Sequence, residues 1–441
     1  MKKTFWKITI AAVAVLLTPL AASAGSVYQE CSPCAPSCGA AKSKWKVGGW
    51  VEMSYYRNAW GQENVYGNDF STDRNMVTDN SGNTYLLGRN KNADFQANQI
   101  WGYVQREMDS KYGFDWGFRA DFAYGTDMIY AQAWNDRTWD WNWGEGDYYG
   151  SIPRLYAEVG YRNLSVKFGR FDTLLGLETL DAPDNFFISR SYSFYTNPIF
   201  TTGVLADYKL GKRATIYAGW INGNDNGFEQ RFDDSMITGG IKYALTKKLD
   251  LSYMFAVGYE YDGMYQSASQ GPEWRYDSHI SPIWWSNRHD VYMQTVNLKW
   301  KPTKRFTYML EGTYQQSEFN NTDDDYSMYA TGMTKHFGVN NHFIYQLNRK
   351  WSLGYRFEWY RAEWNMSDDA GARIDWDGDD FYGHTLALQW KALKHLTITG
   401  EIRYDEVFGD GGRDTFRPFD TVRGVGRNHQ FSGGISAIIH Y

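Results

Sequence analysis

The chain has 441 residues, a formal net charge of −6 at pH 7, and 18% of its residues are Trp, Tyr or Phe. The excess of acidic residues excludes the basic footprint of a nucleic-acid-binding protein and a broad polybasic membrane patch. The mean hydropathy is −0.59, so the many aromatic residues must be interleaved with polar ones, as in strands with one apolar face.

Residues 1–24 have the pattern of a secretory signal peptide. Lysines open the segment, an apolar run follows from Ile8 to Leu17, and Ala22-Ser23-Ala24 supplies a small-residue cleavage site. The run is too short to cross a bilayer as a helix, and no later stretch approaches the roughly 18 apolar residues that a spanning helix needs. A retained N-terminal anchor is the alternative. The sequence therefore predicts export from the cytoplasm.

Three cysteines follow the signal segment with the spacing C-x2-C-x3-C, at Cys31, Cys34 and Cys38. The spacing resembles half a metal site, but no fourth ligand lies nearby, and no cysteine stands at the cleavage point. An oxidising compartment favours one disulfide with a spare or intermolecular thiol. With the prolines and small residues around them, residues 25–43 are predicted to form a flexible tether; metal binding or cross-linking to an envelope component is the alternative.

From Lys44 onward, polar and apolar residues alternate in segments of about ten residues, the length of a tilted strand that crosses a bilayer. In "WKVGGWVEMSYY" (45–56), Trp45, Val47, Val51 and Tyr55 fall on one face. The same alternation occurs in "DWGFRADFAY" (115–124), "LDLSYMFAV" (249–257), "FTYMLEGTY" (306–314), "WSLGYRFEWY" (351–360) and "LTITGEIRY" (396–404).

The connections between these segments are alternately short and long. The short turns are "MDSKYG", "YRNL", "LGKR", "LTKK", "KPTKR", "LNRK" and "KALKH", and the long segments lie near 58–93, 126–151, 172–200, 222–235, 260–288, 316–336, 362–380 and 406–428. This order predicts an all-β fold over residues 44–441: a transmembrane antiparallel β-barrel of about 16 strands with short periplasmic turns and long extracellular loops. The strand near 335–347 is weakly marked, so 14 or 18 strands are alternatives.

A soluble sandwich or propeller would also contain alternating strands. Large aromatics, however, gather at both strand ends, with Trp300 and Trp390 beside short turns and Trp220 and Tyr314 toward long loops. Two such bands are the girdles of a lipid-facing wall. The opposite faces carry charged residues, whose burial in a dry core would be costly, so a water-filled interior is favoured.

The chain ends on a regular strand, "FSGGISAIIHY" (431–441). Phe431, Ile435, Ile439 and Tyr441 share one face, which we expect to look toward lipid with Tyr441 at the inner girdle. Pairing with the strand at 45–56 would close the barrel and leave no free edge in the bilayer. The aromatic C-terminus also resembles the signal that outer-membrane assembly machinery recognises.

Several stretches resemble the OmpL-like family of outer-membrane beta-barrel porins of Gram-negative envelopes. They are "GGWVEMSYY", "NQIWGYVQRE", "DWGFRADFAYGTD", "LYAEVGYRNLSVKFGRFDTLLGLETLDAPDNFFISRSYSF" and "TGVLADYKL". The resemblance is densest from Gly48 to about Asp225 and thins afterward. It implies a porin-like pore in the cell outer membrane and permits a homotrimer; the cysteine tether is not part of it.

A barrel of this size leaves a wide interior, and the third long loop (172–200) is the candidate for a constriction. Unlike the other loops it contains an apolar run, Leu174 to Leu180 and Phe186 to Ile188, which suits packing against the inner wall. Acids on the loop would then face cations of the wall and set up a transverse electric field across the lumen. The alternative is that these acids and cations form ion pairs with each other, which only neutralise the charges of the inner wall. The predicted acids are Asp172, Glu178, Asp181 and Asp184, and the predicted cations are Arg119, Arg154, Lys167, Arg170, Arg356 and Arg403.

The sequence therefore predicts a porin that passes small polar solutes or ions passively. We expect no cofactor and no enzyme activity, since no hydrolase, metalloprotease or nucleotide-binding motif occurs. The rival is a non-conducting structural or adhesive barrel whose aromatic loops bind a partner. The aromatic stretches "WNDRTWDWNWGEGDYYG" and "SPIWWSNRHD" suit sugar stacking or, more simply, loop packing. The acidic runs Asp323–Asp325 and Asp375–Asp380 are interpreted as solvated loop tips, with Ca²⁺ binding as the alternative.

Overall fold

The computed structural model describes residues 44–58, 94–133, 139–140, 143–145, 148–228, 235–261, 288–320, 331–367, 373–409 and 429–441. The predicted signal segment (1–24) and the tether with its three cysteines (25–43) lie outside the described residues, as does the acidic run 323–325.

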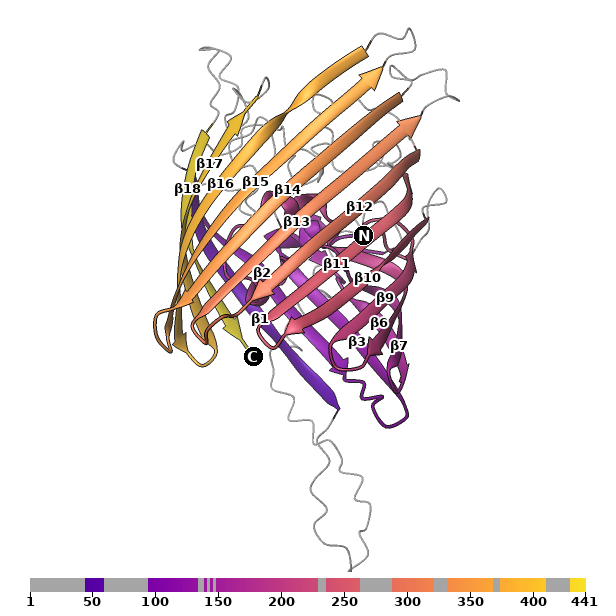
Figure 1. Cartoon of the computed structure of the whole chain (residues 1–441). Helices are drawn as coiled ribbons and strands as arrows, with labels where there is room; N and C mark the ends of the chain where they lie inside the picture. The colour runs from indigo at the N-terminus through magenta and orange to yellow at the C-terminus, as the bar shows by residue number, and fades with distance from the viewer. Residues whose placement is uncertain are drawn as a thin grey trace, which may run out of the picture.

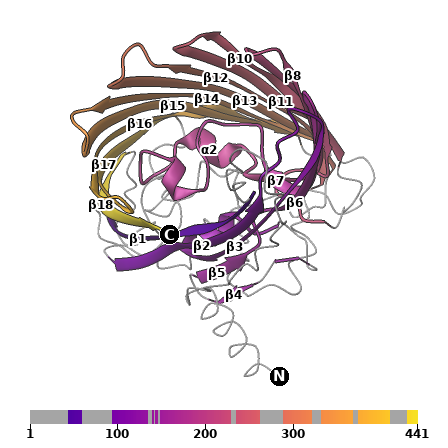
Figure 2. The ribbon, with the colours of Figure 1, turned by 90° about the horizontal axis from the view of Figure 1, so that it is seen from below.

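Sixteen antiparallel strands close into a barrel (Figures 1 and 2). Two further short strands, β4 (Gly144–Glu145) and β5 (Tyr148–Ser151), belong to the connection after β3 and complete an 18-stranded sheet. The barrel strands are β1 (Trp45–Asn58), β2 (Asp94–Arg106), β3 (Phe114–Gly125), β6 (Leu155–Tyr161), β7 (Leu164–Asp172), β8 (Phe200–Leu210), β9 (Ala214–Ile221), β10 (Ser235–Thr246), β11 (Leu249–Tyr261), β12 (Arg288–Trp300), β13 (Phe306–Asn320), β14 (Thr331–Gln346), β15 (Trp351–Ser367), β16 (Arg373–Leu393), β17 (Leu396–Phe408) and β18 (His429–His440).

The predicted closure by the last strand is confirmed. β18 pairs antiparallel with β1, with Trp50 opposite His440 and Ser54 opposite Ser436. Beyond the strand, the backbone of Tyr441 exchanges two hydrogen bonds with Gly49, at 3.2 and 3.1 Å. Every one of the 16 barrel strands therefore has two neighbours, as a lipid-embedded sheet requires.

The two faces of the wall differ as the alternation predicts. In β18, Phe431, Ile435 and Ile439 are about half exposed on the outside (47%, 49% and 51%), whereas Gln430 and Ser436 are buried on the inside. Exposed aromatics mark both ends of the outer face. Those near the short turns are Trp45, Phe114, Trp116, Tyr161, Tyr208, Trp300 and Tyr441; those near the long loops are Phe95, Phe122, Tyr124, Trp220, Tyr259, Phe408 and Phe431.

One barrel strand is interrupted. β3 pairs with β6 up to Ala120 opposite Leu155, and then with β5 from Ala123 opposite Ser151. The residues between β5 and β6 include Pro153, which has no N–H to give to a ladder, and the neighbouring Arg154 carbonyl accepts from Asp121 N at 2.9 Å. Arg154 lies at this irregularity, on the same inward face as Tyr156 and Glu158 of β6, and its side chain is buried.

Several strands extend beyond the predicted loop boundaries. The weakly marked segment 335–347 belongs to β14 as far as Gln346, and β16 has 21 residues. The loop predicted over 362–380 is therefore wrong, because β15 and β16 continue to pair as far as Ser367 opposite Arg373. The interpretation of Asp375–Asp380 as a loop tip is corrected with it: these residues lie in β16, and Asp379 is fully buried.

In the described ranges, helical structure is confined to short segments, η2 (Thr126–Tyr130), η3 (Ala182–Asp184) and α2 (Tyr192–Thr196). Among the described residues, no helix combines the length and the apolar character that a membrane crossing demands. η3 and α2 both belong to the connection between β7 and β8, which Figure 2 shows inside the ring of strands.

Deleting Ile439–Tyr441 should prevent assembly, because Gly49, Trp50 and Val51 of β1 would lose their backbone partners within the bilayer. Heat-modifiable migration of unboiled protein on gels measures the folded barrel. Tyr441→Phe is the control: it removes only the hydroxyl that donates to the Trp101 carbonyl at 2.7 Å and should still assemble. Normal heat-modifiable barrel from the truncated chain would contradict this role of the terminus.

Candidate functional site

The connection between β7 and β8, residues 173–199, folds back into the barrel, and we call it L3. Its second half is almost completely buried, from Phe187 at 3% exposed to Ile199 at 7%. A segment exposed to water would not bury these side chains, so L3 packs against the inner wall (Figure 2).

Apolar residues of L3 make part of this contact. Leu175 belongs to a buried cluster with Met236, Met254 and Met293 from the inner faces of β10, β11 and β12. Leu180 lies in a second cluster that includes aromatic residues of β1, β2, β15 and β16. The apolar run that the sequence places in this loop is therefore buried against opposite sides of the barrel.

Two glycines of the inner wall make room for the loop. A Cβ on Gly354 of β15 would stand 2.2 Å from the Phe186 ring, and one on Gly338 of β14 would stand 2.3 Å from Ser193 Oγ. A side chain at either position would push L3 away from the wall, since contacts this short do not occur in folded proteins.

Arg154 joins L3 to the wall of β3 and β7. Its guanidinium contacts the carboxylates of Asp121 at 2.8 Å, Asp181 at 2.9 Å and Asp172. Asp181 belongs to L3, Asp121 to β3, and Asp172 ends β7. One cation thus bridges three acids where the interrupted strand aims it inward, and charge-assisted bonds of this type are the stronger ones.

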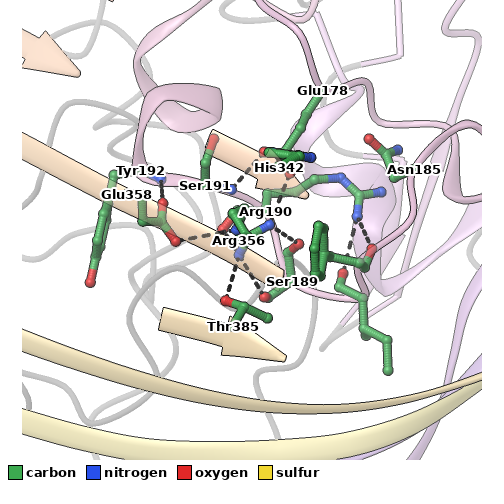
Figure 3. A network of polar contacts seen from close by, with 12 residues as sticks. Glu178, Asn185, Ser189, Arg190, Ser191, Tyr192, His342, Arg356, Glu358 and Thr385 are labelled. Atoms are coloured by element: carbon green, nitrogen blue, oxygen red, sulfur yellow. Dashed lines mark hydrogen bonds and ion pairs between the residues drawn. The ribbon is translucent and has the colours of Figure 1, made fainter. Parts of the chain in front are cut away.

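Arg356 of β15 is the centre of a second network on the other side of L3 (Figure 3). Its Nη1 donates to Glu178 Oε1 at 2.9 Å and to the Ser189 carbonyl at 2.8 Å. Its Nε lies 3.4 Å from Glu358 Oε1, and Glu358 Oε2 accepts from Tyr192 N at 2.8 Å. The side chains of Arg356, Glu178 and Glu358 are at most 3% exposed, so this contact is dry.

Cross-strand register explains why the wall is charged in this way. Arg356 stands opposite Thr385, which stands opposite Arg403, and Glu358 stands opposite Gly383, which stands opposite Asp405. The inward residues of β15 to β17 thus form a basic row beside an acidic row. Arg403 bonds Asp405 at 2.7 Å and Glu358 at 3.1 Å.

Arg190 organises L3 from within. Its guanidinium donates to the carbonyl oxygens of Thr179 at 2.9 Å, Ile188 at 3.0 Å, and Phe187 and Leu180 at 3.2 Å. Only a planar fork of donors satisfies several carbonyls at once. L3 thereby keeps a fixed shape although it has little regular secondary structure.

The two acids of L3 respond differently to burial. Burial would raise the pKa of Glu178, but Arg356 and other nearby cations outweigh it and lower the pKa to about 2. Burial, together with the neighbouring Asp172, raises the pKa of Asp181 to about 6 in spite of Arg154. Glu178 is therefore ionised at neutral pH and binds Arg356. Asp181 is ionised less readily, because it shares the Arg154 guanidinium with Asp121 and Asp172.

The structure brings together part of the predicted site. Asp172, Glu178 and Asp181 contact Arg154 or Arg356 directly, so they do not stand as an acidic rim facing a basic rim across water. The remaining predicted residues do not take part in these ion pairs. Asp184 is exposed, Arg119 pairs with Asp121 at 2.7 Å, and Arg403 pairs with the wall acids. Lys167 lies over the Tyr156 ring at 4.4 Å, and Arg170 donates to the Ala131 carbonyl at 2.8 Å.

Sequence reasoning missed several members of the network. Glu358 and Glu401 were recognisable as inward residues by alternation, yet their contacts with L3 depend on register across the whole sheet. Glu401 accepts from Ile188 N at 2.7 Å and from Ser189 N at 3.1 Å. Arg190 had one signal, a lone arginine beside the apolar stretch 186–188.

The comparisons with known proteins agree with this architecture. The model of the family described as "Putative beta-barrel porin-2, OmpL-like" matches residues 44–441. The chain belongs to this family. No curated protein sequence matches it.

Two solved structures share the fold of this porin-family chain. The outer-membrane expressed OmpT of Vibrio cholerae gives a TM-score of 0.51 at 9% identity, covering 90% of this chain and 97% of that chain. The outer membrane channel DcaP of Acinetobacter baumannii gives a TM-score of 0.51 at 12% identity, with coverages of 90% and 97%. The predicted family, the closed barrel and the outer-membrane location are thus confirmed.

Glu178→Gln should destabilise the barrel at neutral pH by about 2 kcal/mol, because the glutamine no longer neutralises Arg356. The pKa of Glu178 falls from its ordinary 4.5 to about 2 in the fold, so the stabilisation is present above about pH 4.5 and is lost as the pH falls toward 2. The gap between the urea unfolding midpoints of wild type and variant should narrow over this range. Asp184→Asn, an exposed change on the same loop, is the control, and a gap that does not depend on pH would refute the assignment.

Proposed function

We propose that this outer-membrane protein is a porin through which small polar solutes or ions diffuse passively, and that L3 narrows its lumen. The observation that carries the proposal is a loop of fixed shape, buried against the inside of a barrel of 16 strands. Barrels of this size otherwise leave a wide aqueous channel. The proposed activity requires no cofactor and no catalytic residue.

The polar inner wall supports passage of hydrophilic solutes. Inward residues away from L3 include Gln105, Thr215, Ser252 and Gln389, which are partly exposed. Such groups offer hydrogen bonds to hydrated solutes without binding them tightly, as conduction requires.

A non-conducting barrel is the second candidate, and one observation favours it. L3 contacts several sides of the wall: Leu175 packs toward β10 to β12, Gln99 of β2 donates to the Leu180 carbonyl at 2.8 Å, and Arg356 of β15 binds Glu178. A loop fixed from so many directions could act as a plug. Planar-bilayer recording separates the two, since only a porin conducts in discrete steps.

Deleting Leu174–Ile188 should increase single-channel conductance, because the deletion removes the part of L3 that fills the lumen. A deletion of equal length within residues 410–428, another long connection, should leave the conductance near that of wild type. Heat-modifiable migration establishes that each variant has folded. Unchanged conductance in the L3 variant would overturn the constriction, and a wild type that remains silent while the L3 variant conducts would identify L3 as a plug.

The proposal also covers assembly. We infer that the C-terminal strand is read by outer-membrane assembly machinery and that the barrel is compatible with a homotrimer. The aromatics at both ends of the outer face supply the contact with membrane lipid.

A further inference from the structure

Six of the seven short turns carry cations and no acids. The turns are 162–163, 211–213, 247–248, 301–305, 347–350 and 394–395. Their charged residues are Arg162, Lys212, Arg213, Lys247, Lys248, Lys301, Lys304, Arg305, Arg349, Lys350 and Lys394, all exposed. We call this set of exposed cations the basic rim. The chain as a whole has a formal charge of −6, so the rim is a region of positive charge on an acidic protein.

The contacts of the basic rim leave its charge uncompensated. Lys248 Nζ donates to the Pro302 carbonyl at 2.7 Å, and the Arg162 guanidinium lies 5.2 Å from the centre of the Tyr161 ring. Both partners are neutral. Within the part of the chain that the structure describes, no rim cation belongs to an ion pair, unlike the arginines under L3.

Lysines continue this charge into the barrel, between the rim and L3. Lys242 of β10 lies between Ile241 and Tyr243, which are both 38% exposed on the outer face, so it points inward. In the same strand Met236 packs in the cluster of Leu175, and Lys242 therefore stands on the short-turn side of L3. Lys167 of β7 is inward by the same alternation, because Phe168 is 45% exposed outside.

Tyrosines hold these two lysines on the wall. Lys167 Nζ lies 4.4 Å from the centre of the Tyr156 ring, and Lys242 Nζ lies 5.4 Å from that of Tyr217. A ring face attracts an ammonium without cancelling its charge. The two lysines also repel each other as like charges; β8 and β9 lie between their strands in the sheet.

Acids on this part of the wall offset the lysines only in part. Glu158 interacts with Lys167 and Lys209, and Asp250 stands directly opposite Lys299. These acids compensate part of the positive charge of the inner wall, but among the described residues no ion pair compensates the charge of the basic rim. In the described part of the chain, cations without an acidic partner are therefore concentrated on the six turns of the basic rim.

We propose that the short-turn mouth, comprising the basic rim with Lys167 and Lys242, collects anionic solutes such as small carboxylates and phosphates and gives the pore a preference for anions. This inference rests on the proposed porin function. Fixed charge acts over a Debye length of about 8–10 Å at physiological salt, and a low-dielectric wall focuses its field into the opening. Arg154 and Arg356 at L3 are buried and paired with acids, so the preference is set at the mouth and along the wall below the loop.

The test is the reversal potential of single channels in a KCl gradient. Wild type should be anion-selective, and Lys167→Gln with Lys242→Gln should lower the ratio of chloride to potassium permeability by about twofold or more. Lys167→Arg with Lys242→Arg keeps the charge and should keep the ratio. Lys335→Gln with Arg361→Gln is the matched control, because it removes the same charge from the outer surface of β14 and β15.

The possible results separate this inference from the porin function. Channels that conduct in steps but prefer potassium, or whose preference is the same in the Lys167/Lys242 glutamine variant, overturn the anion-collecting mouth while the porin stands. A folded wild type without conductance steps overturns the porin function itself. A large effect of the outer control would show that net charge, and not the mouth, governs the preference, and would also overturn the inference.

Discussion

The position of L3 and the ionisation of the inner wall depend on each other. Arg356 and Arg403 have no exposed side-chain surface, and an unpaired guanidinium in such a place would cost several kcal/mol. Wall acids neutralise part of this charge, and L3 supplies the rest through Glu178 and the carbonyls of residues 189 and 190. Without the loop the wall would need water around its arginines, and without the arginines the loop would keep its apolar contacts but lose the partner of Glu178.

Because buried arginines need acidic partners, the paired and the unpaired charges of the barrel have different roles. Charges covered by L3 are dry and mutually compensated, so they act mechanically and fix the shape of the lumen. Charges that remain wet, such as Lys242, can act on solutes at a distance because water alone screens them. A single barrel thus separates structural ions from those available to what passes through.

Much of the fold could be predicted from the sequence, because a period of two is visible without any knowledge of neighbours. Phe431 and Ile435 alternate with Gln430 and Ser436, which assigns one face to lipid and the other to the lumen. The prediction of strands of about ten residues was wrong where two strands continue to pair beyond the membrane, as β15 and β16 do. Residues there no longer need to alternate in hydrophobicity, so their strands resemble loops.

The candidate site was less predictable, because its contacts join residues whose distance apart depends on the register of every intervening strand. Glu178 and Asp184 are both acids of one loop, yet only the first meets a wall arginine. Arg154 lies on the inward face, as alternation with Tyr156 and Glu158 predicts, but its position beside the break in pairing after Ser151 was not visible in the sequence. Arg190 binds backbone carbonyls, and carbonyl positions leave no trace in a sequence pattern.

The contacts of L3 also determine when the loop can reach its final position during folding. Tyr192 and Ile188 bind Glu358, Asp405 and Glu401, which are separated from them in the chain by 166 to 213 residues. A chain made from its N-terminus finishes L3 long before these strands exist, and closing loops of this length delays contact formation. Asp181 can meet Arg154 early, because Arg154 precedes it in the chain, whereas Glu178 and the buried end of the loop must wait for β15 and β17. Seating of L3 is consequently a late event that reports completion of the barrel.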